Sequence, residues 1–327
     1  MKLLRKAGRL TVLLAVSISP IAAAEIPQAE IASGAVHAIL YPPDAAGGYY
    51  RATRFDWSGV IAKLEWKGHS YFGQWFDRYD PKTNDAIVGP VEEFLTGGAG
   101  LGYAEAKPGD CFVKIGVGAL RKPDESAFHQ FQTYEICDSG KWTVRRGPDW
   151  MEFVQELPAV NGYAYVYRKK VSLRDNPPGL VLEHSLRNTG RKTIETAVYE
   201  HNFFMLDSQP TGPDIVVSFP FAVRAAQASP GLAETRGNQV VFLRELARGQ
   251  TVHTDLEGYG GDARDYDIRV ENRKTGAGVR QTCDRPISKL VLWSIRTTVC
   301  PEAYIDLRVE PQQEANWRIS YEFYSVH

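Results

Sequence analysis

The residues best able to do chemistry lie in TAVYEHNFFMLDSQPTG, residues 196–212, which starts like a β-strand and ends in a turn. With a period of two its side chains fall on two faces, Tyr199, His201 and Phe203 on one and Glu200, Asn202 and Phe204 on the other. An imidazole can exchange a proton near neutral pH, and binding residues concentrate where strands meet loops. The alternative is a strand end with one buried, hydrogen-bonded histidine. We take His201 as a candidate acid or base, flanked by Tyr199 and Asn202.

A second group, residues 47–81, combines aromatic rings with charged side chains. The apolar face of a sugar ring packs on an aromatic side chain, while its hydroxyls need fixed donors and acceptors. As a set these residues indicate carbohydrate binding, whereas any one ring alone could simply belong to the core. The candidate contacts are Arg51, Arg54, Asp56 and Trp75.

Two further places offer carboxylates. Glu92 and Glu93 precede the glycine-rich TGGAGLGY, where they could accept hydrogen bonds from sugar hydroxyls, and a solvated turn is the alternative. Glu302 follows Cys300-Pro301 at the start of an expected strand, where it could serve as a general base. A surface position is the common alternative for a lone glutamate.

Familiar cofactor motifs are absent from the sequence. It has no GxxxxGK[ST] phosphate loop, no GxSxG, no HExxH and no CxxC pair, and its seven histidines are scattered. Nothing local therefore argues for a metal or nucleotide and we expect no cofactor, with a metal site assembled in space from some of the histidines as the alternative.

The elements that must position these residues are strands almost throughout. Alternating segments rich in Val, Ile, Tyr, Phe and Trp, such as GYAYVYRKKVSL, KLVLWSIR and WRISYEFYSV, are bounded by Gly, Pro, Asn and Asp. Only VEEFL and PDWMEFVQEL suggest a helical turn. The pattern predicts an all-β fold, a large antiparallel sandwich or barrel. Because no change in composition marks a linker, we interpret residues 25–327 as one domain.

Residues 1–24 have the order of a secretory signal peptide: the basic MKLLRKAGR, the apolar LTVLLAVSISPIA and the small AAAE. A membrane anchor is less favoured because the apolar run is shorter than the roughly 20 residues a spanning helix needs. We expect cleavage after Ala24 and a periplasmic or secreted protein. Cleavage removes four of the 38 basic residues and leaves 34 against 39 acidic ones, a net charge of −5. That balance argues against nucleic acid or a membrane surface as a partner.

Four cysteines would then meet an oxidising compartment, where disulfides persist. Three pairings are possible on paper. We predict the two that are local in sequence, Cys111–Cys137 and Cys283–Cys300.

Three segments together resemble the galactose mutarotase-like superfamily, which includes the aldose 1-epimerases. EHNFFMLDSQ resembles the family's His-x-Tyr-Phe-Asn-Leu-(Asp)-Gly segment, and RKTGAGVRQTCDRPISKLVLW its Ser-Gly-Arg strand and following turn. CPEAYIDLRVEPQQEANWRISYEF resembles its C-terminal Glu-Pro segment and last strand. The resemblance spans most of the chain after residue 24 and implies a large antiparallel β-supersandwich.

The resemblance also implies roles. His201 would act as the acid on a sugar's ring oxygen, Glu302 as the base on the anomeric hydroxyl, and Arg54 or Arg51 would bind substrate. The sequence departs from the family pattern in three places. Thr96 stands where a second histidine precedes Gly-Gly, and Met205 stands where the family has asparagine. The family's substrate-binding aspartate has no clear counterpart, and the nearby options are Asp262, Asp265 and Asp267.

The leading expectation is therefore an exported aldose 1-epimerase-like enzyme that binds a monosaccharide or oligosaccharide. The alternatives are a polysaccharide lyase, using Tyr199 or His201 with an arginine, and a glycoside hydrolase, using Glu302 with Glu93 or Asp56. A non-catalytic carbohydrate-binding protein is the third possibility. A closed pocket would favour a monosaccharide, and a long cleft lined by aromatic rings and arginines a polymer.

Overall fold

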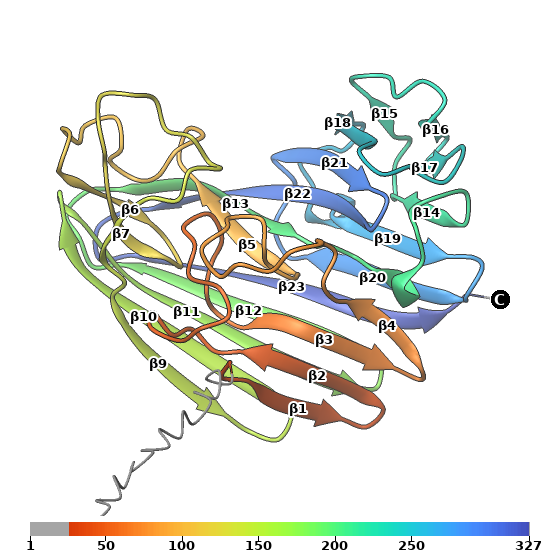
Figure 1. The fold of residues 1–327 in the computed structure, drawn as a ribbon, viewed down its shortest axis with the longest axis horizontal. Coiled ribbons are helices and arrows are strands. Elements are labelled where there is room, and N and C mark those ends of the chain that lie inside the picture. The colour runs from red at the N-terminus through yellow and green to blue at the C-terminus, as the bar shows by residue number, and fades with distance from the viewer. Residues whose placement is uncertain (1–25, 327) are drawn as a thin grey trace, which may run out of the picture.

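A computed structural model describes residues 26–326, and the expected signal peptide lies outside this range. The regular structure in this range is antiparallel β-strand, apart from two single 3₁₀ turns, η1 (Leu206–Ser208) and η2 (Ala263–Asp265). The predicted all-β fold is confirmed (Figure 1). No helix among residues 26–326 is long and apolar enough to cross a bilayer.

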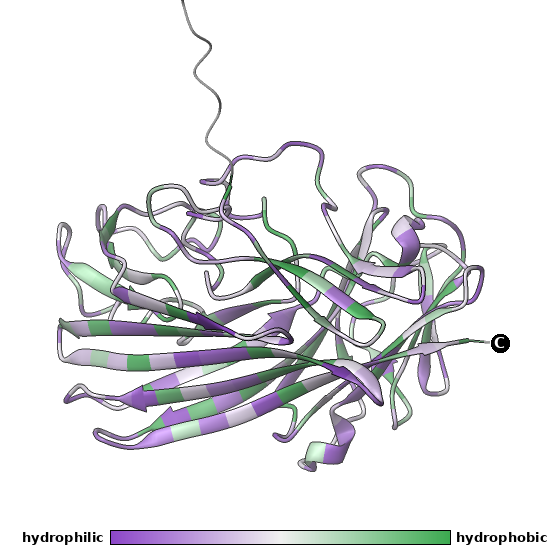
Figure 2. Cartoon of the chain, turned by 90° about the horizontal axis from the view of Figure 1, so that it is seen from below, coloured by the Kyte–Doolittle hydropathy of each residue, from purple (hydrophilic) through white to green (hydrophobic). Residues whose placement is uncertain are grey.

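The largest layer is a ten-stranded sheet. In spatial order its strands are β16 (Ala233–Arg236), β17 (Gln239–Phe242), β14 (Ile215–Ser218), β19 (Asp267–Asn272), β20 (Ala277–Cys283), β23 (Glu314–Ser325), β12 (Pro178–Asn188), β11 (Tyr163–Asp175), β10 (Trp150–Val160) and β9 (Lys141–Arg146). Buried positions alternate with partly buried or exposed ones along much of β10 and β11, and Figure 2 shows bands of hydrophobic and hydrophilic residues along the strands. On β11 the alternation expected for GYAYVYRKKVSL is present, and its buried positions include Lys169.

A six-stranded sheet lies against this layer. Its order is β15 (Arg224–Ala225), β18 (Thr251–Glu257), β21 (Lys289–Ile295), β22 (Thr298–Val309), β13 (Ile194–His201) and β5 (Val91–Leu95). Strand β22 contacts β12 and β23 of the large sheet, and Figure 1 shows β13 and β22 running over that layer. Apolar side chains of both sheets, such as Leu182 and Ile305, form one continuous core.

Two smaller sheets complete the fold. One consists of β1 (Ala29–Ser33), β2 (Val36–Tyr41), β3 (Val60–Trp66) and β4 (His69–Phe72), and the other of β6 (Cys111–Lys114), β7 (Gly118–Arg121) and β8 (Ile136–Asp138). The long connections between these strands carry the aromatic segment and the glycine-rich segment toward the six-stranded sheet. The fold thereby brings residues 47–81 near residues 196–212.

Two expectations about the elements are wrong. VEEFL and PDWMEFVQEL form strands β5 and β10 rather than helical turns. On β10 the first eight residues alternate between buried positions and positions that are partly buried or exposed, which is the period of a strand. On β5 the first four residues are all buried because the strand is covered on both faces.

The cysteines divide into one disulfide and two thiols. The predicted Cys111–Cys137 bond is present and links β6 to β8. The predicted Cys283–Cys300 bond is wrong, and both residues are free and buried. Cys283 ends β20 of the ten-stranded sheet, whereas Cys300 lies on β22 of the six-stranded sheet. The chain crosses between layers in this interval, so proximity in sequence does not become proximity in space.

The unreduced protein should therefore show two reactive thiols when unfolded in denaturant, and peptide mapping should find only the Cys111–Cys137 crosslink. Replacing both Cys111 and Cys137 by serine should lower the free energy of unfolding by about 3 kcal/mol, because the bond closes a loop of 26 residues in the unfolded chain. Thiol titration and denaturant unfolding measure these effects. Finding no free thiol in the denatured protein would contradict this pairing.

Candidate active site

One face of the six-stranded sheet forms the floor of a cavity of about 830 Å³. Alternate residues of four neighbouring strands line it: Ala197, Tyr199 and His201 from β13, Glu302, Tyr304 and Asp306 from β22, Lys289, Val291 and Trp293 from β21, and His253 from β18. Phe203 continues this face beyond the end of β13. The alternation predicted from the sequence therefore directs Tyr199, His201 and Phe203 into the cavity.

His201 and Glu302 meet on this floor, with Nε2 of the imidazole 3.3 Å from Oε1 of the carboxyl group. The antiparallel register explains the meeting. Tyr199 pairs with Tyr304, so the residue two positions later on β13 lies near the residue two positions earlier on β22. Both side chains are nearly enclosed, with exposed fractions of 6% and 7%. Residues 101 positions apart in sequence thus form an acid–base pair.

Burial sets the protonation of this pair. It raises the pKa of Glu302 to about 8, and the negative charge of Glu93 adds to the rise while Arg54 and Lys289 oppose it. Burial, followed by the positive charge of Arg54, lowers the pKa of His201 well below its ordinary value. At neutral pH the pair therefore holds one proton, and the proton resides on Glu302.

Aromatic packing, rather than hydrogen bonding, holds the His201 ring. The imidazole stacks on Phe203, with centroids 3.8 Å apart and planes within 10°, and Trp75 stacks on the far side of Phe203 at 4.7 Å. Phe203 has a φ of 46°, so the backbone turns here and carries its ring back over the histidine. His201 Nδ1 is buried without a hydrogen-bond partner in the described part of the chain. Proton exchange is thus directed to Nε2.

Arg54 forms part of the cavity wall, where three side chains hold its guanidinium. Its Nε donates to Glu93 at 2.8 Å, and its two terminal nitrogens donate to Asp85 at 2.6 Å and to the Tyr199 hydroxyl at 3.2 Å. Glu93 also accepts from Tyr199 at 2.6 Å and from Lys114 at 3.2 Å. Glu93 does not line the cavity. Through these hydrogen bonds Glu93 instead holds the Arg54 and Tyr199 side chains in position at the cavity wall.

Of the other residues proposed from the sequence, some line the cavity and some do not. Trp75 lines the cavity, and its Nε1 donates to the Ile87 carbonyl at 2.8 Å. Arg51 lies off the cavity wall and donates to the Ala46 carbonyl at 2.7 Å.

Asp56 and Asn202 face the interior. Asp56 accepts hydrogen bonds from the Ser58 amide at 2.9 Å and the Tyr167 hydroxyl at 3.0 Å. Asn202 donates to the Pro301 carbonyl at 2.8 Å. Their hydrogen-bonding groups hold the sandwich together rather than reach the cavity.

Several lining residues were not selected by the sequence reasoning. They are Asp85, Phe131, His253, Lys289, Trp293, Tyr304 and Asp306. Period-two alternation extended from Glu302 along β22 would have found Tyr304 and Asp306. Lys289 and Trp293 share one face of β21 in the same way. Asp85 and Phe131 come from loops, where no periodicity exists to indicate direction. The three aspartates considered for substrate binding, Asp262, Asp265 and Asp267, do not line the cavity.

Comparison with solved structures supports the fold independently. An aldose epimerase homologue from C. elegans aligns over 92% of this chain and 99% of its own, with a TM-score of 0.58 and 14% identity. Galactose mutarotase-like proteins from Clostridium acetobutylicum and Lactobacillus casei each give a TM-score of 0.55, with 13% and 11% identity. They cover 91% of this chain and 95% and 100% of their own. This chain has the galactose mutarotase-like fold.

Sequence comparisons add no nearer relationship. No protein-family model matches the chain, and no curated protein matches it. At identities of 11–14% the structural likeness establishes the fold alone. The chemistry has to be argued from this chain's own side chains.

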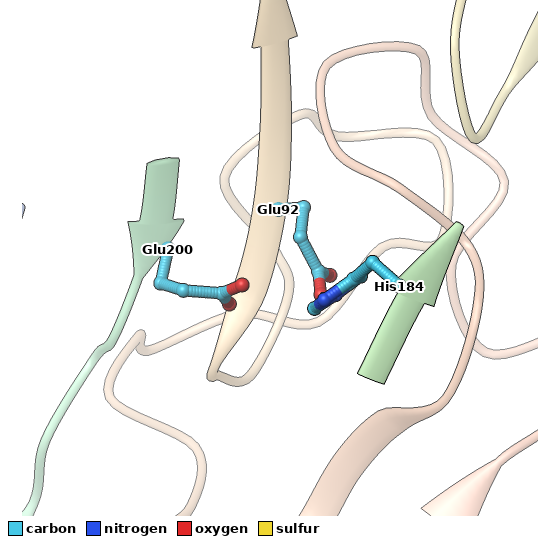
Figure 3. A group of neighbouring side chains, drawn as sticks. All are labelled: Glu92, His184 and Glu200. Atoms are coloured by element: carbon cyan, nitrogen blue, oxygen red, sulfur yellow. The ribbon is translucent and has the colours of Figure 1, made fainter. Parts of the chain in front are cut away.

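Beneath the cavity floor, this galactose mutarotase-like fold buries a second charged group, in which Glu92, His184 and Glu200 converge (Figure 3). Each could offer one ligand atom to a metal, and these atoms lie within 4.8 Å of one another. Glu92 already has partners within the protein, however, because Lys169 Nζ lies 2.5 Å from its Oε2 and His184 Nε2 lies 2.6 Å from its Oε1. The geometry fits a buried ion-pair network better than a metal centre.

The titration of this network agrees with that interpretation. Burial opposes ionisation of Glu92, but Lys169 and His184 outweigh it and lower its pKa to about 2. Burial and the charge of Glu92 raise the pKa of Asp56 to about 7 and that of Glu200 well above its ordinary value. At neutral pH Glu92 is thus ionised opposite the Lys169 ammonium, and it supports the fold rather than contacting the cavity.

Replacing Lys169 by methionine should lower the free energy of unfolding by about 3–5 kcal/mol, because Glu92 would remain buried without its cation. The matched control is Lys170→Met on the opposite face of β11, where we expect a change within about 0.5 kcal/mol. Chemical denaturation of both variants measures the difference. Equal stability of the two would refute the ion-pair interpretation.

Proposed function

We propose that this chain is an exported, carbohydrate-active enzyme of the aldose 1-epimerase type, which interconverts the anomers of a sugar by acid–base catalysis. The single observation that carries the proposal is the His201–Glu302 pair, which holds one proton at 3.3 Å separation on the floor of a cavity with aromatic walls. The galactose mutarotase-like fold supports it, because structures described as aldose epimerase homologues share that fold.

Anomer interconversion requires two proton movements in each direction. One group removes the proton from the anomeric hydroxyl, another delivers a proton to the ring oxygen, and the bond between the anomeric carbon and the ring oxygen breaks to give the open-chain aldehyde. Rotation about the adjacent carbon–carbon bond followed by the reverse transfers closes the other anomer. In ring opening, and again in ring closing, the catalytic pair accepts one proton from the sugar and donates one to it. A pair that holds one exchangeable proton therefore suffices.

His201 and Glu302 can fill these roles in both directions. In the proposal Glu302 receives the anomeric hydroxyl proton and His201 protonates the ring oxygen, which requires the shared proton to start on the imidazole. In the empty cavity the proton resides on Glu302, and 3.3 Å separates the two atoms between which it would transfer. Hydroxyls of the sugar that donate to Glu302 would favour this transfer, because hydrogen bonds to a carboxylate stabilise its charged form.

The cavity wall supplies binding groups for the same ligand. Arg54, fixed by Glu93 and Asp85, presents donors, and the Tyr199 hydroxyl lies beside it. Trp75 and Trp293 provide rings on which the apolar face of a sugar could pack. Thr96, which replaces the family's second histidine, does not line the cavity, although Gly97 and Gly98 do. We assign the additional donor to Lys289, which lies on the wall near Glu302.

Export is the remaining part of the proposal. It rests on the basic, apolar and small-residue order of residues 1–24. The Cys111–Cys137 disulfide suits an oxidising compartment.

Replacing Glu302 by glutamine should reduce kcat/KM for anomer interconversion at least about 100-fold, because the amide cannot exchange the proton. His201→Asn should cause a loss of similar size. Proton NMR of freshly dissolved aldoses measures the rate, and Glu257→Gln, an exposed glutamate of β18, serves as the matched control with unchanged turnover. Full activity in either cavity variant would refute the assignment. Tight sugar binding without turnover in the wild type would indicate a binding protein instead.

The rate of anomer interconversion should fall when the pH rises above neutrality, but not when it falls slightly below. Because the pKa of Glu302 is raised to about 8, the pair loses its single proton as the pH rises through that value, and kcat/KM should fall above about pH 8. Because the pKa of His201 lies well below its ordinary value, no loss is expected until the pH is well below 6.5. An NMR rate profile tests this, and a rate that rises through pH 8 would contradict it.

A further inference from the structure

A second cavity adjoins the proposed active site and has no part in the chemistry described above. We propose that it is a subsite for a second sugar residue, so that the ligand is a neutral oligosaccharide whose reducing-end sugar lies over His201 and Glu302. This inference rests on the proposed function for the placement of the reducing end, but the second cavity is defined by its own residues.

The main cavity is larger than a single sugar residue needs. Cavities of about 300–1,000 Å³ typically enclose drug-sized ligands. The cavity above His201 has about 830 Å³, near the upper end of that range, whereas a single hexose is smaller than such ligands. A monosaccharide alone would leave much of the wall without contact.

Trp75 is shared between the main cavity and a second one. A cavity of about 560 Å³ lies beyond this ring, and Trp75 lines both spaces. The walls of the outer cavity include Phe76, Arg248, Arg296 and Thr297. A chain of two sugars could therefore pass over one indole, with one sugar in each cavity.

Trp75 is held in the way a sugar platform requires. Its indole nitrogen is fixed by the Ile87 carbonyl, one face of the ring lies on Phe203, and the Thr297 hydroxyl donates to its backbone carbonyl at 2.7 Å. The Phe76 ring meets it edge-on, with planes at 88°. A platform fixed before binding loses little conformational entropy when a ligand packs against it.

The polar groups of the outer cavity point to a neutral ligand. Arg248 is paired with Asp77, and Arg296 lies 2.5 Å from Glu245. Each guanidinium already has a carboxylate partner, so this space offers donors and acceptors without surplus positive charge. Such paired groups suit sugar hydroxyls, which both donate and accept, better than the carboxylate of a uronic acid.

The direct test is binding, measured by calorimetry with the catalytically impaired but complete Glu302→Gln chain. The probes are glucose with maltose, cellobiose and lactose, which all carry glucose at the reducing end, and xylose with xylobiose. At least one disaccharide should bind about tenfold more tightly than its own reducing-end sugar, which corresponds to one added pair of good contacts. If every disaccharide binds no more tightly than its monosaccharide, or none of the probes binds, the inference is overturned.

Two variants test whether the added affinity for a disaccharide comes from the outer cavity. Arg248→Ala and Arg296→Ala should each reduce the disaccharide advantage to about threefold or less while the affinity for the monosaccharide stays unchanged. Arg224→Ala, another exposed arginine paired with a glutamate but remote from both cavities, is the control and should retain the full advantage. An advantage that survives both variants would exclude this subsite, and tighter binding of uronate disaccharides would exclude the neutral ligand.

A parallel NMR measurement separates this inference from the proposed function. Preferential binding of a disaccharide without faster anomer exchange in the wild type would support the subsite and contradict the epimerase. Faster exchange of monosaccharides and disaccharides with equal kcat/KM and equal affinity would support the epimerase and contradict the subsite.

Discussion

Burying a carboxylate costs several kcal/mol unless a cation or hydrogen bonds compensate it, and this chain buries four glutamates on three adjacent strands. The arrangement of positive charge follows from that cost. Glu92 has the Lys169 ammonium and a hydrogen bond with His184, and Glu93 has Arg54 and Lys114. Glu200 avoids the cost by keeping its proton.

Glu302 differs from Glu92 and Glu93 because no lysine or arginine of the described chain pairs with it. The nearest basic group is an imidazole that is itself buried and resists protonation, so the carboxyl group retains its proton to about pH 8. Burial thereby raises the pKa of Glu302 toward working pH and lowers that of His201 away from it, so the shared proton stays on the carboxyl group. Both glutamates are buried, but Glu93 is ionised and paired with Arg54, whereas Glu302 keeps its proton. The difference between them is only which cation lies within reach.

Strand register decides which glutamate has which role. On β5 and β13, Glu93 pairs with Tyr199 and Glu92 with Glu200, so one pair faces the cavity side and the other faces the ten-stranded sheet. A shift of one residue would exchange the two sets, moving Glu200 toward the cavity and His201 into the core. The ion pairs between Glu92 and the large sheet therefore stabilise the register as well as the layers.

Much of this could be predicted from the sequence, and the failures have physical causes. The alternation in TAVYEHNFF correctly placed Tyr199 and His201 on one face, because period two is a local property of the chain. Adjacent Glu92 and Glu93 could not be divided in the same way, since β5 is buried on both faces and no polar face reveals its direction. The partners of Arg54 are 31, 39 and 145 positions away, a separation that no local pattern encodes. The Cys283–Cys300 prediction failed for the related reason that the intervening chain changes sheets.

The position of the shared proton connects binding to chemistry. In the empty cavity the proton lies on Glu302, because the imidazole is enclosed by Phe203, Phe55 and Trp293 and its Nδ1 lacks a partner among residues 26–326. An apolar ligand would remove water and strengthen this preference, since desolvation favours the neutral acid. A ligand with hydroxyl donors would act in the opposite sense, by stabilising the carboxylate and allowing the proton to move to the imidazole. The same hydroxyl groups that Arg54 and the aromatic wall would select are thus the groups that would place the pair in its reactive form.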